Sequence, residues 1–276
     1  MMRKAIDPAQ PSGGDRVAKV IARAGLCSRR EAERWIAQGR VAVDGVTLTS
    51  PAVAVTSGNV ITVDGERLPA AERPRLFRFH KPAGVLTTAN DPQGRPTIYD
   101  HLPAELPRLM PVGRLDFNSE GLLLLTNDGA LKRHLELPAT GWIRRYRARV
   151  YGAADPAGLA ALANGVTVDG VAYGPIEARL DGDAKEPAKG RNVWLTISLR
   201  EGKNREVRKV LAYLGLAVNR LIRIGYGPFQ LGDLPRGAGE EVPWKALREQ
   251  LGRIVTAAPA APHETPPARR KDRRRG

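Results

Sequence analysis

The chain of 276 residues has a single cysteine, Cys27, so no disulfide bond can form within it. A chain of this kind fits a reducing compartment such as the cytosol. Only four histidines are present, and their positions match no metal-ligand spacing, so we expect no metal site. No apolar run approaches the length of a membrane span, and residues 1–14 contain no apolar stretch typical of a secretory signal. We therefore expect a cytoplasmic protein that does not contact a membrane.

Acidic residues are the minority among the charged ones. The chain has 44 Lys and Arg against 29 Asp and Glu, which gives a formal net charge of +15. The excess is +3 in residues 1–73, +8 in residues 74–262 and +4 in residues 263–276, so it does not come from one basic tail. This charge favours an acidic partner, with nucleic acid the first candidate, and a generally basic surface is the alternative.

The distribution of proline, glycine and charge divides the chain into five segments. Residues 1–14 are typical of a flexible leader, and residues 15–65 predict a small unit of two short helices and a sheet. Residues 66–75, with two prolines among charges and alanines, predict a linker. Residues 76–255 predict a larger domain. Residues 256–276 are rich in Ala and Pro and then in Arg, which predicts a disordered basic tail.

The small unit has a recognisable order of residues. Apolar residues recur at helical spacing from Val17 to Ala24, and Ser28 with Glu31 predicts a capping box at the start of a second helix. By charge alone, the basic stripes on these helices are either a solvated surface or a phosphate-binding face. The sequence from residues 24 to 45 closely resembles the S4 RNA-binding domain, which implies binding to structured RNA mostly through phosphates and shape. The candidate RNA contacts here are Arg16, Lys19, Arg23, Arg29, Arg30 and Arg34.

The larger domain is organised around four consecutive leucines at residues 122–125. So short a uniformly apolar run favours a strand buried on both faces over one turn of a buried helix. Asp116 precedes this run, in a predicted loop between Gly113 and Gly121. Taken alone, Asp116 is either a turn former or a carboxylate held at the edge of a dry core, where it can act as nucleophile or general base.

Two later segments carry aromatic and basic side chains. Alternation in residues 146–150 predicts a strand with Tyr146 on its apolar face, where it is either a core aromatic or a ligand contact. Asn204 is predicted to cap a helix whose first turns contain Arg205 and Arg208. Cations at that end oppose the helix dipole, which favours a carboxylate or phosphate nearby.

These signals stand in a fixed order, which resembles that of bacterial ribosomal RNA pseudouridine synthases of the RsuA/RluB family. The motifs are, in chain order, His80–Gly84, Gly113–Asp116, Arg145–Tyr146 and Glu201–Arg208. The resemblance covers about residues 15–250, and the motif around Asp116 is the most specific. Ser119 stands where the family more often has threonine. The resemblance implies an α+β chain: a small S4-like RNA-binding module, then a catalytic domain with a largely antiparallel central sheet and flanking helices.

The resemblance also implies an isomerase that needs no cofactor and no metal and forms pseudouridine in RNA. Such an enzyme breaks the N1–C1′ bond of a uridine, turns the base and rejoins it through C5. Asp116 matches the catalytic aspartate, Tyr146 the tyrosine that packs against uracil, and Arg208 the basic residue that pairs with the aspartate and keeps it ionised. The uridine should be flipped out of the folded RNA. Further candidate RNA contacts are Lys81 in a predicted turn, Arg95 in a predicted exposed loop, Arg114, Lys203 and Arg205.

The basic tail and the Asn204–Arg208 sequence favour 23S ribosomal RNA of the large subunit as the partner, bound by a monomer during ribosome assembly. The alternative substrates are 16S ribosomal RNA and transfer RNA. A non-catalytic RNA-binding assembly factor is the alternative function. A DNA-binding regulator fits only the charge, because no recognition helix of the helix-turn-helix type stands out. The sequence does not name the target uridine.

Overall fold

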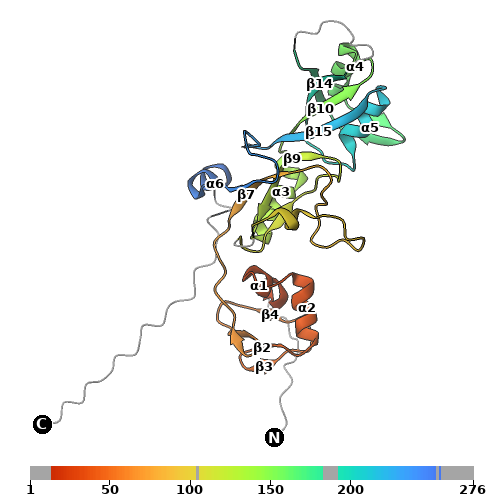
Figure 1. The fold of residues 1–276 in the computed structure, drawn as a ribbon. Coiled ribbons are helices and arrows are strands. Elements are labelled where there is room, and N and C mark those ends of the chain that lie inside the picture. The colour runs from red at the N-terminus through yellow and green to blue at the C-terminus, as the bar shows by residue number, and fades with distance from the viewer. Residues whose placement is uncertain (1–13, 104–105, 183–191, 253–254, 256–276) are drawn as a thin grey trace, which may run out of the picture. The chain divides into compact units, whose positions relative to one another are not determined.

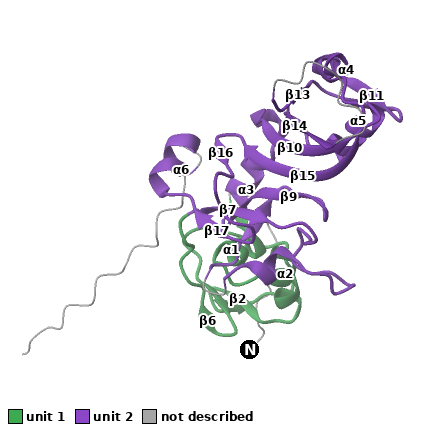
Figure 2. Ribbon diagram, turned by 45° about the horizontal axis from the view of Figure 1, so that its top comes forward, with its two compact units in different colours: residues 1–73, 257–276 green, residues 74–256 purple. Residues whose placement is uncertain are grey.

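The computed structural model describes residues 14–103, 106–182, 192–252 and 255. These residues form two compact units, and the division between them along the chain lies between Arg73 and Pro74 (Figures 1 and 2). The described part of unit 1 is residues 14–73, and that of unit 2 begins at Pro74. The predicted tail at residues 256–276 and the predicted leader, except Gly14, lie outside the described residues.

Unit 1 packs two helices against short antiparallel strands. Its elements are β1 (Asp15–Arg16), α1 (Val17–Arg23), α2 (Arg29–Ala37), β2 (Val41–Val43), β3 (Val46–Thr47), β4 (Ala54–Val55), β5 (Ile61–Val63) and β6 (Glu66–Arg67). Four of the strands form a sheet in the order β3-β2-β5-β6, and β1 pairs with β4. Ser28 begins α2 by accepting a hydrogen bond from the amide of Glu31 at 3.1 Å, as the capping pattern predicts.

Unit 2 is built on a nine-stranded sheet. Its main path is β13 (Ile176–Leu180), β14 (Asn192–Leu199), β10 (Arg144–Tyr151), β15 (Ala217–Tyr226), β9 (Glu120–Thr126), β7 (Leu76–Lys81) and β17 (Gly239–Glu241). Strand β8 (Met110–Val112) pairs with β9, and β16 (Phe229–Gln230) pairs with β15. Strands β11 (Val166–Val168) and β12 (Val171–Tyr173) form a separate hairpin. Within the described sheet only β9 and β15 run parallel, so the predicted α+β fold with a largely antiparallel sheet is confirmed.

Four α-helices and three short 3₁₀ turns are described around this sheet. The helices are α3 (Gly129–Glu136), α4 (Pro156–Ala161), α5 (Glu206–Tyr213) and α6 (Trp244–Leu251). The 3₁₀ turns are η1 (Ile98–His101), η2 (Pro138–Thr140) and η3 (Leu162–Asn164). Asp128 accepts hydrogen bonds from two amides at the start of α3, and Asp155 does the same for α4.

Strand β9 is buried on both faces, as its leucine run predicts. All seven of its residues are buried. Leu122 and Leu124 join the core that contains residues of α3 and α6. Leu123 and Leu125 join a second core with Phe79 and residues of η1. Alternate residues of a strand point to opposite faces, so one apolar run serves both cores.

A third core in unit 2 lies under α5. Val207, Val210 and Leu211 of this helix pack with buried residues of β10 and β14. Gly215, with φ at +74°, follows the end of the helix. This core fixes the first turn of α5 against β15, beside the Asp116 loop.

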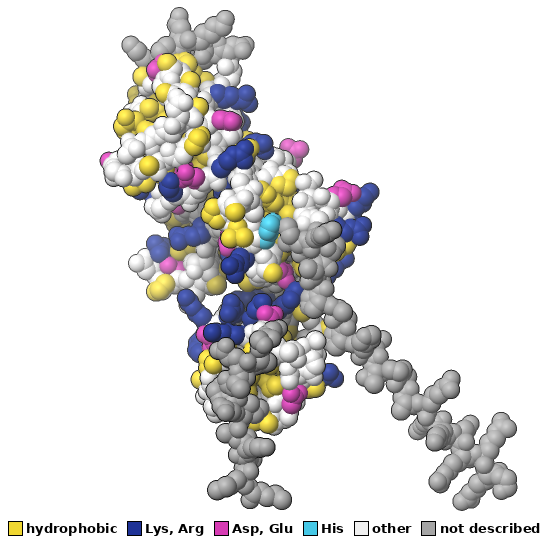
Figure 3. Space-filling model, turned by 180° about the vertical axis from the view of Figure 1, so that it is seen from behind, with side chains coloured by type: hydrophobic (Ala, Val, Ile, Leu, Met, Phe, Trp, Pro, Cys, Tyr) yellow, Lys and Arg dark blue, Asp and Glu magenta, His cyan; other side chains and the backbone are white. Residues whose placement is uncertain are grey.

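The described chain has no helix of the length and apolarity needed to cross a bilayer. Figure 3 shows Lys and Arg side chains on both units, with fewer acidic side chains among them. This surface matches the regional charge excess in the sequence.

Candidate active site

Residues 113–119 connect β8 to β9 and include Asp116. Gly113 begins this loop and Gly121 follows it as the second residue of β9, both with positive φ, +66° and +105°, a conformation that other residues rarely adopt. A Cβ atom at Gly121 would lie 2.3 Å from the carbonyl oxygen of Arg223 on β15. Gly121 therefore allows the two parallel strands to approach each other beside Asp116.

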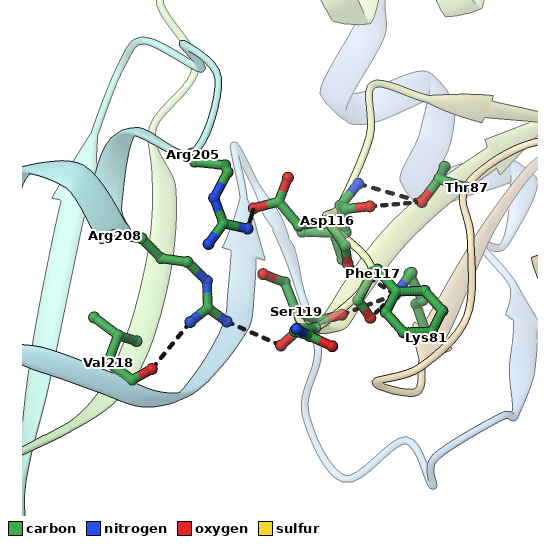
Figure 4. Close-up of polar contacts among 10 residues, drawn as sticks. Lys81, Thr87, Asp116, Phe117, Ser119, Arg205, Arg208 and Val218 are labelled. Carbon is green, nitrogen blue, oxygen red and sulfur yellow. Dashed lines mark hydrogen bonds and ion pairs between the residues drawn. The ribbon is translucent and has the colours of Figure 1, made fainter.

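Lys81, at the end of β7, holds this loop from within the protein (Figure 4). Its side chain has no exposed surface, and its Nζ donates hydrogen bonds to the carbonyl oxygens of Ser119 at 2.8 Å, Pro82 at 3.0 Å and Asp116 at 3.1 Å. Burial lowers the pKa of Lys81 to about 8, although the charges of Asp116 and Glu120 act in the opposite direction. The predicted RNA contact of Lys81 is wrong, because its ammonium group is enclosed by backbone carbonyls.

Two backbone anchors fix the residues on either side of Asp116. The Thr87 hydroxyl donates to the carbonyl oxygen of Leu115 at 3.0 Å and accepts from its amide at 3.3 Å. The amide of Gly84 donates to the carbonyl oxygen of Phe117 at 2.8 Å. The main chain at Asp116 is thus held by residues from the segment after β7.

Arg205 provides the cation beside Asp116. Its Nη1 lies 3.6 Å from Oδ2 of Asp116 (Figure 4). Arg205 has φ at +53° and stands just before α5, so the helix begins at Glu206 and the predicted cap at Asn204 is wrong. The carboxylate of Glu206 instead accepts a hydrogen bond from the amide of Lys203 at 2.8 Å. The carboxylate expected near the cations at this helix end is Asp116.

Arg208 binds the backbone of the Asp116 loop and not the carboxylate of Asp116. Its guanidinium donates to the carbonyl oxygen of Asn118 at 2.9 Å and to that of Val218 at 3.0 Å. Burial lowers the pKa of Arg208, the charge of Arg205 lowers it further, and Asp116 opposes both. The structure therefore corrects the predicted Arg208–Asp116 pair, since the ion pair runs from Arg205. Arg208 links α5, β15 and the Asp116 loop.

A pocket of about 490 Å³ opens where these elements meet. It brings together side chains from three separate motifs of the sequence, namely Arg114, Asp116, Tyr146, Lys203, Arg205 and Arg208. Six cationic side chains line it against the carboxyl groups of Asp116, Glu136 and Glu206. A pocket of this volume accommodates a small ligand, and its charge suits an anionic one.

The pocket wall also includes charged and aromatic residues that are not among the predicted site residues, namely Glu136, Arg144, Glu206, Arg223 and Tyr226. Glu206 is 3% exposed, and burial raises its pKa. Arg223 is also 3% exposed and lies on the same face of β15 as the buried Leu221. Arg223 stands between Ile222 and Ile224, an alternation that ordinarily leaves an arginine in solvent, so the sequence carries no signal for its burial.

Other candidate residues lie away from the pocket. Arg95 is on the surface after β7 and pairs with Asp91 at 2.8 Å. In unit 1, Lys19 pairs with Asp15, and Arg34 pairs with Glu31. The basic residues Arg16, Lys19, Arg29, Arg30 and Arg34 are exposed and Arg23 is half-buried. RNA binding by these residues stays a prediction.

Within the described ranges, no group of three or more His, Cys, Asp or Glu side chains is arranged to hold a metal ion. The chemistry that the pocket offers is that of a half-buried carboxylate, an aromatic ring and several cations. Such a set can act on an electron-poor carbon of an anionic substrate.

Comparisons with known proteins agree on one family. The profile of the family described as RNA pseudouridylate synthase matches residues 75–213, and that of the S4 domain matches residues 15–61. An RNA pseudouridine synthase of Rickettsia felis is 44% identical over 234 residues, which cover 85% of this chain and 99% of the relative. Ribosomal large subunit pseudouridine synthase B of Yersinia pestis is 41% identical over 272 residues, covering 95% and 82%. A crystal structure of a pseudouridylate synthase covers 85% of this chain and 98% of its own, with a TM-score of 0.59 and 26% identity.

Proposed function

The chain belongs to the RNA pseudouridylate synthase family, and from this premise we propose that it converts one uridine of 23S ribosomal RNA into pseudouridine. As a family member it is an isomerase that acts on RNA, with an S4 domain ahead of its synthase domain. The finer proposal concerns the RNA. It is supported by the name of the Yersinia pestis relative, a large-subunit enzyme, and by the basic C-terminal sequence.

The observation that carries the proposal is the pocket itself. One pocket contains Asp116, Tyr146 and six cationic side chains drawn from segments far apart in the sequence. The side chain of Asp116 is 29% exposed, so an RNA nucleotide that enters the pocket can reach its carboxylate. An RNA base inside a helix is out of reach, which supports flipping of the target uridine.

We propose the following roles for the residues of the pocket. Asp116 acts at the ribose, where the N1–C1′ bond of the uridine breaks, and Arg205 orients its carboxylate. Tyr146 packs against the uracil ring. Arg208 positions the Asp116 loop through the carbonyl of Asn118.

A pseudouridine map of 23S and 16S ribosomal RNA from cells that lack this gene tests the substrate. Carbodiimide labelling and primer extension report each position, and wild type and Asp116→Asn are added back separately. We expect one site in 23S RNA to be lost and to be restored only by the wild type. A lost site in 16S RNA, or one in transfer RNA alone, would replace the proposed substrate. If no RNA loses a site, the alternative hypothesis of a non-catalytic RNA-binding assembly factor replaces the proposed function.

Purified Asp116→Asn should lose at least about 10³-fold in turnover, because the amide cannot supply the anionic charge of the carboxylate. RNA affinity should stay within about threefold of wild type, because a neutral amino group replaces one carboxylate oxygen and the basic side chains that bind phosphates are unchanged. The measurements are single-turnover pseudouridine formation and filter binding on the same 23S RNA transcript. Retained turnover would remove Asp116 from the catalytic role.

A further inference from the structure

Arg223 is a buried cation that is held rigidly in the wall of the pocket. It lies on β15, its side chain is 3% exposed, and it lines the pocket with Asp116 and Tyr146. Its Nε donates a hydrogen bond to the carbonyl oxygen of Leu122 at 2.7 Å. Its guanidinium carbon lies 5.2 Å from the ring centroid of Tyr226, in cation–π contact. These contacts fix the guanidinium plane before any ligand arrives.

The two terminal nitrogens of Arg223 lack a protein partner within the described ranges. Neither donates a hydrogen bond to a residue that the structure describes, and Nη2 is buried. Among the described residues, no carboxylate oxygen lies within 4.0 Å of the guanidinium. A buried charge without a counter-charge destabilises the folded chain. This arrangement therefore points to an acceptor that is supplied by a ligand.

The position of Arg223 indicates which part of a nucleotide it meets. Its Cα partner on the neighbouring strand is Tyr146, and paired residues of antiparallel strands project to the same face. Asp116 and Arg205 are 29% and 48% exposed and lie nearer the solvent, where the ribose and phosphates of an RNA chain enter. A flipped base goes deepest, so the uracil is the group that reaches Arg223.

We propose that Arg223 is a further catalytic residue, which stabilises the negative charge that uracil acquires when its glycosidic bond breaks; the inference rests on the proposed function. When the N1–C1′ bond breaks, its electron pair stays with uracil, where the negative charge is shared among N1, O2 and O4. The ribose carbon C1′ is left electron-poor, and the carboxylate of Asp116 balances the positive charge on the ribose. The guanidinium keeps its proton and donates hydrogen bonds to a carbonyl oxygen of this anion. When C5 bonds to C1′, the electron pair returns to the ribose carbon, C5 loses its proton and N1 gains one.

The step fits the general rule that fixed donors aimed at developing charge accelerate a reaction most. Cations held in place before the reaction need no reorganisation, and they act strongly in a site with little water. Turning the uracil about its N3–C6 axis exchanges O2 with O4, so one fixed guanidinium can serve the base before and after the turn. Arg223 thereby contributes to both the breaking and the forming step.

Single-turnover kinetics with a 23S RNA transcript test this role, using wild type, Arg223→Ala and, as a matched control, Arg149→Ala. Arg149 is exposed on the neighbouring strand β10 and does not line the pocket. We expect Arg223→Ala to form pseudouridine about 10²–10³-fold more slowly, the loss typical of one preorganised donor. RNA affinity should stay within about threefold of wild type, and Arg149→Ala should be within about threefold in rate. Guanidinium ion at millimolar concentration should partly restore Arg223→Ala, and neutral urea of similar shape should not.

The inference is overturned if Arg223→Ala turns over within threefold of wild type, or if weaker RNA binding accounts for the whole loss. Equal rescue by urea and guanidinium also overturns it, because charge would then be irrelevant. If Arg223→Ala does not fold, Arg223→Gln takes its place, since its amide is neutral and can still donate to Leu122. Wild-type turnover in the same assay distinguishes the two proposals. If the wild type does not modify the 23S transcript, the proposed substrate is wrong. If it does, the result for Arg223→Ala tests only the role of Arg223.

Discussion

Arg205 and Arg208 contact the Asp116 loop differently, so their replacement should have different effects. Arg205 is half-exposed and pairs with the carboxylate of Asp116 at 3.6 Å. An exposed ion pair contributes little to stability, so Arg205→Gln should change the free energy of unfolding by less than about 0.5 kcal/mol. Turnover should fall at least about tenfold, because the carboxylate loses the cation that orients it. Urea denaturation and single-turnover kinetics measure the two quantities.

Arg208→Gln is the comparison for that variant. Arg208 donates two hydrogen bonds to backbone carbonyls, so its loss should cost about 1–3 kcal/mol in stability and should also slow turnover. Equal stability losses in the two variants would contradict the distinction. In that case Arg205 would be as structural as Arg208.

Lys81 connects the pH to the position of the Asp116 loop. Burial lowers its pKa to about 8, so the ammonium group is present at pH 7 and is lost as the pH rises through 8. A neutral amine has one donor fewer and turns a lone pair toward carbonyl oxygens that the ammonium had bound. We expect single-turnover rates to fall above about pH 8 for this reason.

Stability should change in the opposite direction for this group. Between about pH 8 and the ordinary value of 10.5, the folded chain has released a proton that the unfolded chain retains. The contribution of Lys81 to the free energy of unfolding therefore rises with pH, by up to about 1.4 kcal/mol per pH unit. Lys81→Met, which cannot titrate, should be slow at every pH and should lack the decrease above pH 8. A decrease of the same shape in Lys81→Met would assign it to another group.

At the scale of single residues, the sequence predicts which side chains share a site better than it predicts their partners. Asp116 and Tyr146 line one pocket, as their motif order implies. The burial of Lys81 depends on β7 continuing through His80 to Lys81, where the sequence predicts a turn instead. Arg205, and not the predicted Arg208, pairs with Asp116 because Arg205 adopts a positive φ. The sequence does not indicate this conformation, since the residue is not a glycine.

The contact between β9 and β15 is the element-scale feature that places Asp116 opposite α5. Gly121 permits it, because an added Cβ would meet the carbonyl oxygen of Arg223 at 2.3 Å and its amide nitrogen at 2.7 Å. Gly121 also has φ at +105°. We expect Gly121→Ala to lower the free energy of unfolding by about 3 kcal/mol or more, since backbone strain and overpacking add. Urea denaturation measures this loss, and turnover should fall with it because Arg223 and Asp116 move apart.

Gly113→Ala is the matched control at the other end of the loop. Gly113 also has positive φ, +66°, but nothing lies within 4 Å of its added Cβ. Only the backbone strain applies, so the loss should be about 1 kcal/mol. Equal losses at the two glycines would show that the close approach of β15 has no special cost.

Elements with a strong local signal were predictable, and those set by tertiary contacts were not. The leucine run predicts β9, and the capping pattern at Ser28 predicts the start of α2. Strand β15 begins at Ala217, in a polar stretch without a local strand signal, because it pairs with the whole length of β10. The short strand β17 has charged residues and forms only by pairing with β7. Pairing with a distant strand leaves no periodic pattern in so short a segment.

At the scale of the whole chain, basic residues occur in both units as well as at the C-terminus, so RNA affinity should have separable contributions. Residues 263–276 carry a charge of +4, with six basic side chains. This segment lies outside the described residues, and its effect is predicted from charge alone. Each neutralised phosphate of single-stranded RNA contributes about 0.7 to the slope of log affinity against log salt concentration.

Deletion of residues 256–276 should therefore weaken binding of ribosomal RNA at low salt and reduce that slope by up to about 4. The modified position should stay the same, because phosphate contacts carry no sequence information and the pocket lies in unit 2. Filter binding over a salt series and a pseudouridine map measure the two effects. The control keeps residues 256–276 but has glutamine in place of the six basic residues and of Glu264 and Asp272, so it loses the same net charge of +4 and should match the deletion. If either variant modifies a different uridine, the tail selects the site, and the specificity cannot rest on the pocket and the S4 domain alone.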